Sequence, residues 1–194
     1  GVARVHYRPK GAAAGTPALG VRARAVIGAD GARSEVARQC IPGGTEVPFV
    51  YAYHEILRTP READAPPGYD ARRCDVYYQG RLSPDFYAWV FPHGDTISAG
   101  AGTAHKGFSI RGAVGDLRVE AGLDRAEVLR REGAPIPLKP LRRWDNGRDV
   151  VVAGDAAGVV APASGEGIYY ALACGRMAGD AVEDAGEFHA AEPN

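Results

Sequence analysis

The sequence predicts a mixed fold, α/β in its outer parts and α+β overall, and three observations lead to this prediction. Segments 21–38 and 150–182 each resemble a strand, an acidic glycine-containing loop and a helix in succession. The region between them alternates apolar and polar residues as antiparallel strands do. We therefore expect residues 1–40 and 141–194 to form a partial Rossmann-like domain, with an antiparallel sheet domain, residues 41–140, inserted into it.

Strand-like residues 2–7 and a turn precede the first segment, which begins with residues 21–27; these alternate as one strand with a polar face. That strand ends in a loop containing Asp30 and Gly31, and Ser34 is placed to cap a short helix. Taken alone, Asp30–Gly31 is as consistent with an ordinary turn as with a ligand-binding loop.

The inserted region is predicted to contain strands at 47–57 and 74–78, separated by a charged, proline-rich loop at 58–72. Apolar residues at helical spacing then predict an amphipathic helix over 110–122. We also expect a second short helix over 125–131.

An aromatic hairpin lies between these elements, in residues 84–100. Strand alternation places Tyr87, Trp89 and Phe91 on one face, with small residues opposite them on the returning strand. Such an aromatic stripe is most often core packing, but it can also line a pocket for a long apolar chain. Because the facing residues are small, we favour the pocket and expect a cavity there.

The last segment begins with the apolar run 150–153, which stops abruptly at Gly154 and Asp155. The sequence Gly165–Glu166–Gly167 then opens a helix expected to run from Ile168 to about Val182. A carboxylate after a strand can accept hydrogen bonds from sugar hydroxyls, while glycines and a helix N-terminus favour a close, negatively charged ligand. This pattern indicates a nucleotide-type cofactor, although a simple strand-to-helix turn is the alternative.

Composition limits the possible functions. The chain has 194 residues, with 23 Lys and Arg against 24 Asp and Glu, so it carries no charge signature of nucleic-acid binding. The three cysteines, Cys40, Cys74 and Cys174, have no paired spacing and no histidine cluster, which favours a reducing compartment and no metal site. No apolar run approaches the ~18 residues that a membrane span requires.

Together the two acidic loops resemble those of flavoproteins built like aromatic hydroxylases. The first loop matches a GADGxxSxVR-type motif through Gly28, Ala29, Asp30, Gly31 and Ser34, with Val36 and Arg38 in its tail. The second matches the GD motif at 154–157. The resemblance implies that both loops fold onto FAD, that Asp155 binds its ribityl or pyrophosphate part, and that Gly165–Glu166–Gly167 faces the pyrimidine side of the flavin.

Two further stretches are similar to the geranylgeranyl reductase family, in particular its bacteriochlorophyll and chlorophyll branch: SGEGIYYA at 164–171 and PDFYAWVFP at 84–92. This resemblance implies an enzyme that uses FAD, with NADPH or another donor, to hydrogenate C=C bonds of a geranylgeranyl chain. The chain would be carried by bacteriochlorophyll or by a diphosphate and leave in phytyl form. Tyr87, Trp89 and Phe91 would form the isoprenoid-binding wall.

The reaction also needs a proton, and the catalytic donor is unknown from the sequence. The candidates are Tyr51, Tyr53, His54, Tyr87 and His93. Glu166 is expected to help start its helix rather than to donate a proton. Two rival functions remain: an FAD-dependent aromatic monooxygenase, and a non-catalytic lipid-binding fragment.

The resemblance implies a cytoplasmic protein that can contact the photosynthetic membrane peripherally to reach its isoprenoid or pigment substrate. No GxGxxG follows a strand anywhere in the chain. We therefore expect a piece of a longer protein that lacks the ADP-binding segment, and we expect this piece alone to bind FAD weakly and to be inactive.

Overall fold

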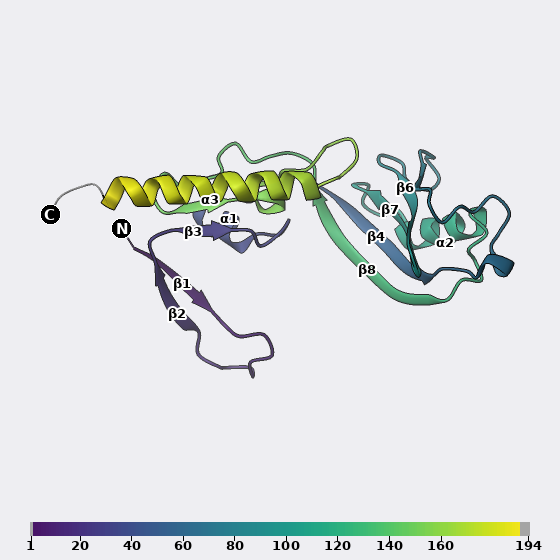
Figure 1. Ribbon diagram of the computed structural model, residues 1–194, viewed down its shortest axis with the longest axis horizontal. Helices are drawn as coiled ribbons and strands as arrows, with labels where there is room; N and C mark the ends of the chain where they lie inside the picture. The colour runs from purple at the N-terminus through teal and green to yellow at the C-terminus, as the bar shows by residue number, and fades with distance from the viewer. Residues whose placement is uncertain (1, 191–194) are drawn as a thin grey trace. The chain divides into compact units, whose positions relative to one another are not determined.

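The structure is a computed structural model that describes residues 2–190, with side chains described for residues 2–186 (Figure 1). It divides the chain into two compact units. The two-segment unit contains the chain up to Pro48 and from Pro137 onward, and the sheet unit is Phe49–Ile136.

These divisions differ from the 40/41 and 140/141 boundaries expected from the sequence. Residues 41–48 belong to the two-segment unit, because Ile41 is buried in its core and Val47 packs against that core. At the other boundary, Leu138 donates its backbone N–H to the carbonyl of Pro48, which ties residues 138–140 to the same unit.

The two-segment unit contains two small sheets. Strand β1 (Ala3–Tyr7) pairs antiparallel with β2 (Leu19–Ala23), and β3 (Val26–Gly28) pairs parallel with β9 (Val150–Val152). The single strand expected over 21–27 is therefore wrong, because the chain changes partner after Ala23. Its first part completes the hairpin with β1, and its last part joins β9.

Helices pack beside the parallel pair. Helix α1 (Glu35–Cys40) contacts both β9 and the 3₁₀ turn η2 (Gly154–Ala157), and α3 (Ile168–Ala190) packs on η2. Helix α3 is longer than the helix expected from the sequence, which ended near Val182. The buried core that joins these elements includes Ala37, Val152, Ala157, Cys174 and Ala178.

The sheet unit contains five strands in the order β5-β6-β7-β4-β8. They are β4 (Phe49–Arg58), β5 (Asp75–Tyr77), β6 (Ala88–His93), β7 (Thr96–Thr103) and β8 (Val128–Pro137), with a short 3₁₀ turn η1 (Glu62–Asp64) in the loop after β4. The antiparallel pairs β5–β6, β6–β7 and β4–β7 confirm the predicted antiparallel sheet.

The short helix expected over 125–131 is wrong. Most of that segment belongs to β8, which lies beside β4 in the sheet. Its charged side chains find partners across the sheet instead of along a helix: Arg131 Nε donates to Glu55 Oε1 at 3.1 Å, and Glu132 reaches His54 at 3.1 Å.

Helix α2 (Ile110–Glu120) covers one face of this sheet, as its contacts with β7 and β4 show (Figure 1). Its buried residues Ala113, Val114 and Leu117 repeat at helical spacing, which confirms the predicted amphipathic helix. They pack on the sheet residues that point to the same side: Tyr53, Leu57, Ala88, Val90, Ile97, Ala99 and Ala101. The core of the sheet unit therefore lies between α2 and this face.

Candidate functional site

The two acidic loops start next to each other. Parallel strands β3 and β9 end at the same edge, and the Ala153 N–H donates to the Gly28 carbonyl at 2.9 Å, just before the loops diverge. In parallel α/β sheets, ligands bind outside the carboxyl ends of the strands. The sequence analysis predicted both loops, and the parallel pairing places their starting points side by side.

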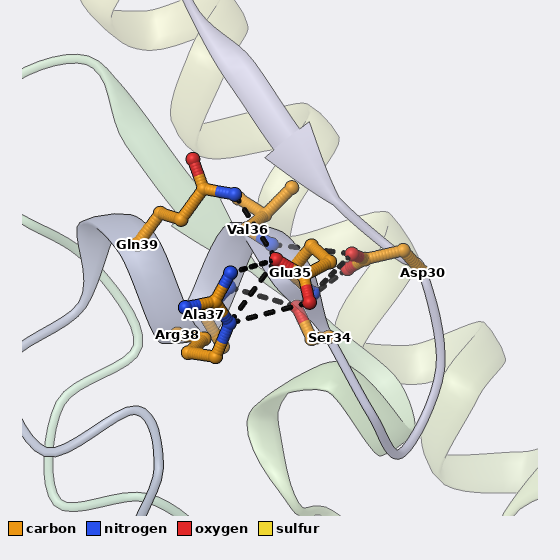
Figure 2. Close-up of polar contacts among 7 residues, drawn as sticks. All are labelled: Asp30, Ser34, Glu35, Val36, Ala37, Arg38 and Gln39. Carbon is orange, nitrogen blue, oxygen red and sulfur yellow. Dashed lines mark hydrogen bonds and ion pairs between the residues drawn. The ribbon is translucent and has the colours of Figure 1, made fainter. Parts of the chain in front are cut away.

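Asp30 is the first acidic residue of this edge, and its carboxylate caps helix α1 (Figure 2). Oδ1 accepts the Ser34 hydroxyl at 2.5 Å, while Oδ2 accepts the backbone N–H groups of Glu35 and Val36 at 2.7 and 3.2 Å. Ser34 Oγ in turn accepts the N–H of Ala37 at 2.8 Å, which confirms Ser34 as the helix cap.

The pKa of Asp30 is consistent with a charged carboxylate at the start of α1. Burial opposes the charged form of Asp30, but the hydrogen bonds from Ser34 and from backbone N–H groups outweigh it and hold the pKa of Asp30 below its ordinary value. Both carboxylate oxygens are thus engaged by the chain itself. Asp30 shapes the loop, while Gly31, with a φ of 82° and open space beside it, leaves backbone there for a ligand to approach.

Gly28 is a contributor that the sequence analysis did not assign to packing. A β-carbon on it would lie 2.7 Å from Val36 Cγ1 and 3.0 Å from Val152 Cγ1, so only glycine lets α1 pack this closely against the strand end. Its position at the end of a strand that leads through a short loop to a helix cap was the available signal.

Asp155, in the second loop, is in a different state. Burial raises the pKa of its carboxyl group above the ordinary value. Among the described residues, no hydrogen-bond donor reaches the carboxylate, and Asp155 accepts only through its backbone carbonyl, from the N–H of Gly158. A partly buried carboxylate without a donor is an acceptor available to a ligand hydroxyl.

The start of α3 borders this carboxylate. A β-carbon on Gly167 would lie 3.1 Å from Asp155 Oδ1, so the missing side chain at position 167 leaves the carboxylate accessible. Gly154 and Gly165 both have positive φ, 59° and 67°, which forms the turns on either side. Glu166 Oε1 accepts the backbone N–H of Tyr169 at 2.9 Å, in the manner of a helix-start residue.

In the sheet unit, the predicted aromatic stripe forms a continuous row of rings. The ring centroids of Tyr87 and Trp89 lie 5.8 Å apart, and those of Trp89 and Phe91 lie 6.1 Å apart. Tyr78 adds a ring 5.9 Å from Tyr87. The residues between them, Ala88 and Val90, belong to the core under α2, so the stripe lies on the opposite face of the sheet.

The cavity expected opposite the stripe is wrong at two positions. A β-carbon on Gly100 would lie 2.3 Å from Trp89 Cζ2, and one on Gly102 would lie 2.6 Å from Phe86 Cδ1. The space left by these two glycines of β7 is therefore filled by the ring of Trp89 on β6 and by the ring of Phe86, which precedes β6. The indole of Trp89 lies over Gly100 and is only 9% exposed, while the Tyr87 ring is tilted by 65° from it.

The candidate proton donors are separated by the sheet. Tyr53 lies under α2, where its hydroxyl donates to Glu55 Oε1 at 3.0 Å, and burial raises its pKa. His54 points to the aromatic face, 6.4 Å from Trp89 between ring centroids. Tyr51 and His93 are exposed, and burial raises the pKa of Tyr87. Strand alternation places Tyr53 and His54 on opposite faces, but only the tertiary structure shows which face meets α2 and which carries the aromatic stripe.

Metal and disulfide chemistry find no support in the part of the chain that the structure describes. Within it, no group of three or more His, Cys, Asp or Glu residues is placed to hold a metal ion. The three cysteines are free, with Cys174 buried in the core and the others exposed. No helix in residues 2–190 is long and apolar enough to cross a bilayer.

Comparison with known proteins shows which proteins the sequence is similar to. No family model matches the chain. It is 58% identical over 159 residues to a geranylgeranyl diphosphate reductase of Rhodobacter capsulatus, covering 82% of this chain and 39% of the relative. It is 36% identical over 179 residues to the chloroplastic geranylgeranyl diphosphate reductase of Oryza sativa, covering 91% and 37%. The chain thus spans about two fifths of the length of these relatives.

Solved structures identify the fold. A geranylgeranyl bacteriochlorophyll reductase-like protein from Thermoplasma acidophilum has a TM-score of 0.72 at 23% identity, over 90% of this chain and 44% of that one. The flavin-dependent halogenase CmlS has a TM-score of 0.57 at 16% identity, over 88% and 31%. The expected fold, that of FAD-dependent oxidoreductases with an inserted antiparallel sheet, is confirmed.

Proposed function

The chain is a homologue of the geranylgeranyl reductases, and from this premise we propose that it forms part of an FAD-dependent reductase that hydrogenates C=C bonds of a geranylgeranyl chain. The substrate class comprises geranylgeranylated bacteriochlorophyll and geranylgeranyl diphosphate, and the product is the phytyl form. NADPH is the proposed source of electrons.

The observation that carries this proposal is the Asp155 carboxylate. It follows strand β9, it is partly buried with a raised pKa, and no donor among the described residues reaches it. The ribityl hydroxyls of FAD would supply those donors, and their hydrogen bonds would favour the charged carboxylate again. The residues present therefore fit a flavin at this edge.

The surroundings of Asp155 support the same ligand. Glycine at 167 leaves room for close approach, and the N-terminus of the 23-residue helix α3 favours negative charge. When bound, FAD supplies the hydride, and negative charge that develops on its pyrimidine side would lie near such a helix end. Asp30 contributes indirectly, by holding α1 and the first loop in shape.

The aromatic face of the sheet unit is the proposed site for the isoprenoid chain. Tyr87, Trp89 and Phe91 present three neighbouring rings on the side of the sheet that α2 does not cover. Pockets for long apolar ligands are lined mainly by such side chains, with few polar groups. Because the isoprenoid substrate can carry a membrane-bound pigment or lipid head, we also propose that the protein contacts the membrane surface peripherally.

Product analysis tests this function. The complete protein, loaded with FAD and supplied with NADPH or dithionite under anaerobic conditions, is incubated with geranylgeranyl diphosphate or geranylgeranylated bacteriochlorophyll. The expected result is a mass gain of two hydrogens for each reduced double bond. In a parallel aerobic incubation with an aromatic substrate, an aromatic monooxygenase would instead consume oxygen and add one oxygen atom to that substrate. A lipid carrier would bind the chain without changing its mass.

A further inference from the structure

Three residues on neighbouring strands form a row across the aromatic face. Gly100 on β7 is paired with Trp89 on β6 and with His54 on β4. A β-carbon at position 100 would lie 2.3 Å from the indole ring and 2.6 Å from His54 Cβ. The indole therefore lies over the glycine, with its far edge toward His54.

A chain of hydrogen bonds holds the indole in this position. Trp89 Nε1–H donates to Ser98 Oγ at 3.0 Å, and that hydroxyl lies 2.8 Å from His54 Nδ1. His54 Nε2 lies 3.1 Å from Glu132 Oε2. Because a carboxylate only accepts, His54 Nε2 carries the hydrogen, and in the neutral ring Nδ1 accepts the Ser98 hydroxyl. We call Ser98, His54 and Glu132 the indole clamp.

The hydrogen bonds of the clamp also argue against His54 as the proton donor of the reaction. Both ring nitrogens of His54 are already engaged, one by Ser98 and one by Glu132. Ser98 is 5% exposed and lies beneath the indole. Neither residue presents a free proton to the aromatic face, so their arrangement is suited to positioning Trp89 rather than to proton transfer.

Orientation of this ring decides the shape of the aromatic face. Trp89 is the middle ring of the row, within about 6 Å of Tyr87 on one side and of Phe91 on the other. Over Gly100, the indole stacks with Phe91 at an interplanar angle of 26° and meets Tyr87 edge-on at 65°, so the three rings form a continuous row. An indole released from Ser98 could turn away from the sheet and interrupt that row, which would affect an apolar chain long enough to cross all three rings.

We propose that the indole clamp determines substrate specificity: it holds the Trp89 ring over Gly100 and so selects long isoprenoid chains over short ones. The inference rests on the proposed function. It adds Ser98, His54 and Glu132 as positioning residues and Gly100 as the position that must stay without a side chain.

The experiment compares Ser98→Ala with wild type in the complete FAD-loaded protein. Trp89 is followed through its ¹⁵N-labelled indole Nε1–H resonance, which Trp89→Phe assigns. We expect the resonance to move and its hydrogen to exchange faster. Loss of a hydrogen bond worth about 1 kcal/mol predicts a roughly five- to tenfold higher KM for geranylgeranyl diphosphate, with less than about a twofold change for geranyl diphosphate.

Three further variants keep the result interpretable. His54→Phe removes the hydrogen bond between His54 and Ser98. It should also move the indole resonance and raise the KM for the long chain, and it replaces Ser98→Ala as the test if that variant does not fold. His54→Gln retains a donor and an acceptor and should keep the resonance near its wild-type position. Tyr53→Phe removes a buried hydroxyl from the same strand on the opposite face, and it should lower stability without moving the indole signal.

An unchanged indole resonance in Ser98→Ala and His54→Phe would overturn the clamp. A moved resonance with equal KM changes for long and short chains would overturn its role in specificity. A wild-type protein that reduces no prenyl substrate would overturn the proposed function and the specificity role with it, while the resonance would still report whether Ser98 and His54 hold Trp89.

Discussion

The carboxylate of Asp155 lies against the backbone of Gly167, so that a β-carbon at position 167 would stand 3.1 Å from Oδ1. The turn after β9 and the first residues of α3 therefore meet at this carboxylate. It is partly buried, its pKa is raised, and the described residues offer it no donor. Asp30, which follows the neighbouring strand, differs in both respects: its two carboxylate oxygens accept hydrogen bonds from the protein, and its pKa is lowered.

Replacing the free carboxylate should remove the flavin. In the complete protein, Asp155→Ala loses hydrogen bonds between a charged group and the ribityl hydroxyls, each worth about 1.5–3 kcal/mol. We expect at least a roughly tenfold weaker FAD affinity, measured by flavin absorbance after purification and by titration. Asp180→Asn, an exposed carboxylate on α3, is the control. Stoichiometric FAD at unchanged affinity in Asp155→Ala would contradict the assignment.

The same carboxylate should destabilise the protein when no flavin is bound. Its pKa is raised above the ordinary 3.8 by burial, so the unfolded chain ionises it more readily. That penalty is absent below the ordinary pKa and grows as the pH rises through the raised value. Asp155→Asn should therefore raise the melting temperature of the flavin-free protein at pH 7 and not at pH 3. A lower melting temperature at pH 7 would contradict this.

Asp30 should show the reverse dependence on pH. Its pKa in the folded protein is below the ordinary value, so its stabilisation is present above 3.8 and is lost as the pH falls through the lowered pKa. Asp30→Asn keeps an acceptor oxygen but removes the charge, so it should cost about 0.3–1 kcal/mol at pH 7, the usual effect of a negative charge at a helix N-terminus. Thermal unfolding across pH should show the difference from wild type shrinking in acid. A difference that stays constant with pH would exclude the charged cap.

Gly28 should not tolerate a side chain. Gly28→Ala places a β-carbon 2.8 Å from Val36 Cβ and should destabilise the protein by about 1–3 kcal/mol through overpacking. Gly115→Ala is a matched control, because it lies inside α2 with open space beside it and should stabilise by up to about 1 kcal/mol. Chemical denaturation measures both variants. Equal tolerance of the two substitutions would mean that α1 does not pack closely on β3.

Trp89 and Val90 separate the two faces of one strand. Trp89→Ala should impair turnover of long-chain substrate while FAD content and spectrum stay normal, because the lost surface belongs to the proposed substrate wall. Val90→Ala removes core volume under α2 and should mainly lower the melting temperature. Both readouts are taken on the same preparations. If Trp89→Ala instead lowers stability and flavin retention together, the stripe is core, and a fully stable and active variant would exclude both interpretations.

The sequence by itself determined the features that depend on neighbours along the chain. Ser34 was predicted as the cap of α1 because capping involves residues three positions apart, and Ser34 Oγ does accept the Ala37 N–H. Helix α2 and the antiparallel sheet were likewise predicted from local periodicity. The resemblance to geranylgeranyl reductases rested on contiguous motifs, and comparison with curated relatives confirmed it.

Only the tertiary structure decided which segments became partners. The break between β2 and β3 arises because one strand-like run pairs first with β1 and then with β9, and residues 128–131 extend as a strand beside β4 instead of forming a helix. Gly100 was expected to leave a cavity, yet the Trp89 ring fills it from the next strand. The states of Asp30 and Asp155 diverged for the same reason: burial and hydrogen-bond partners depend on packing between distant segments, which local sequence does not encode.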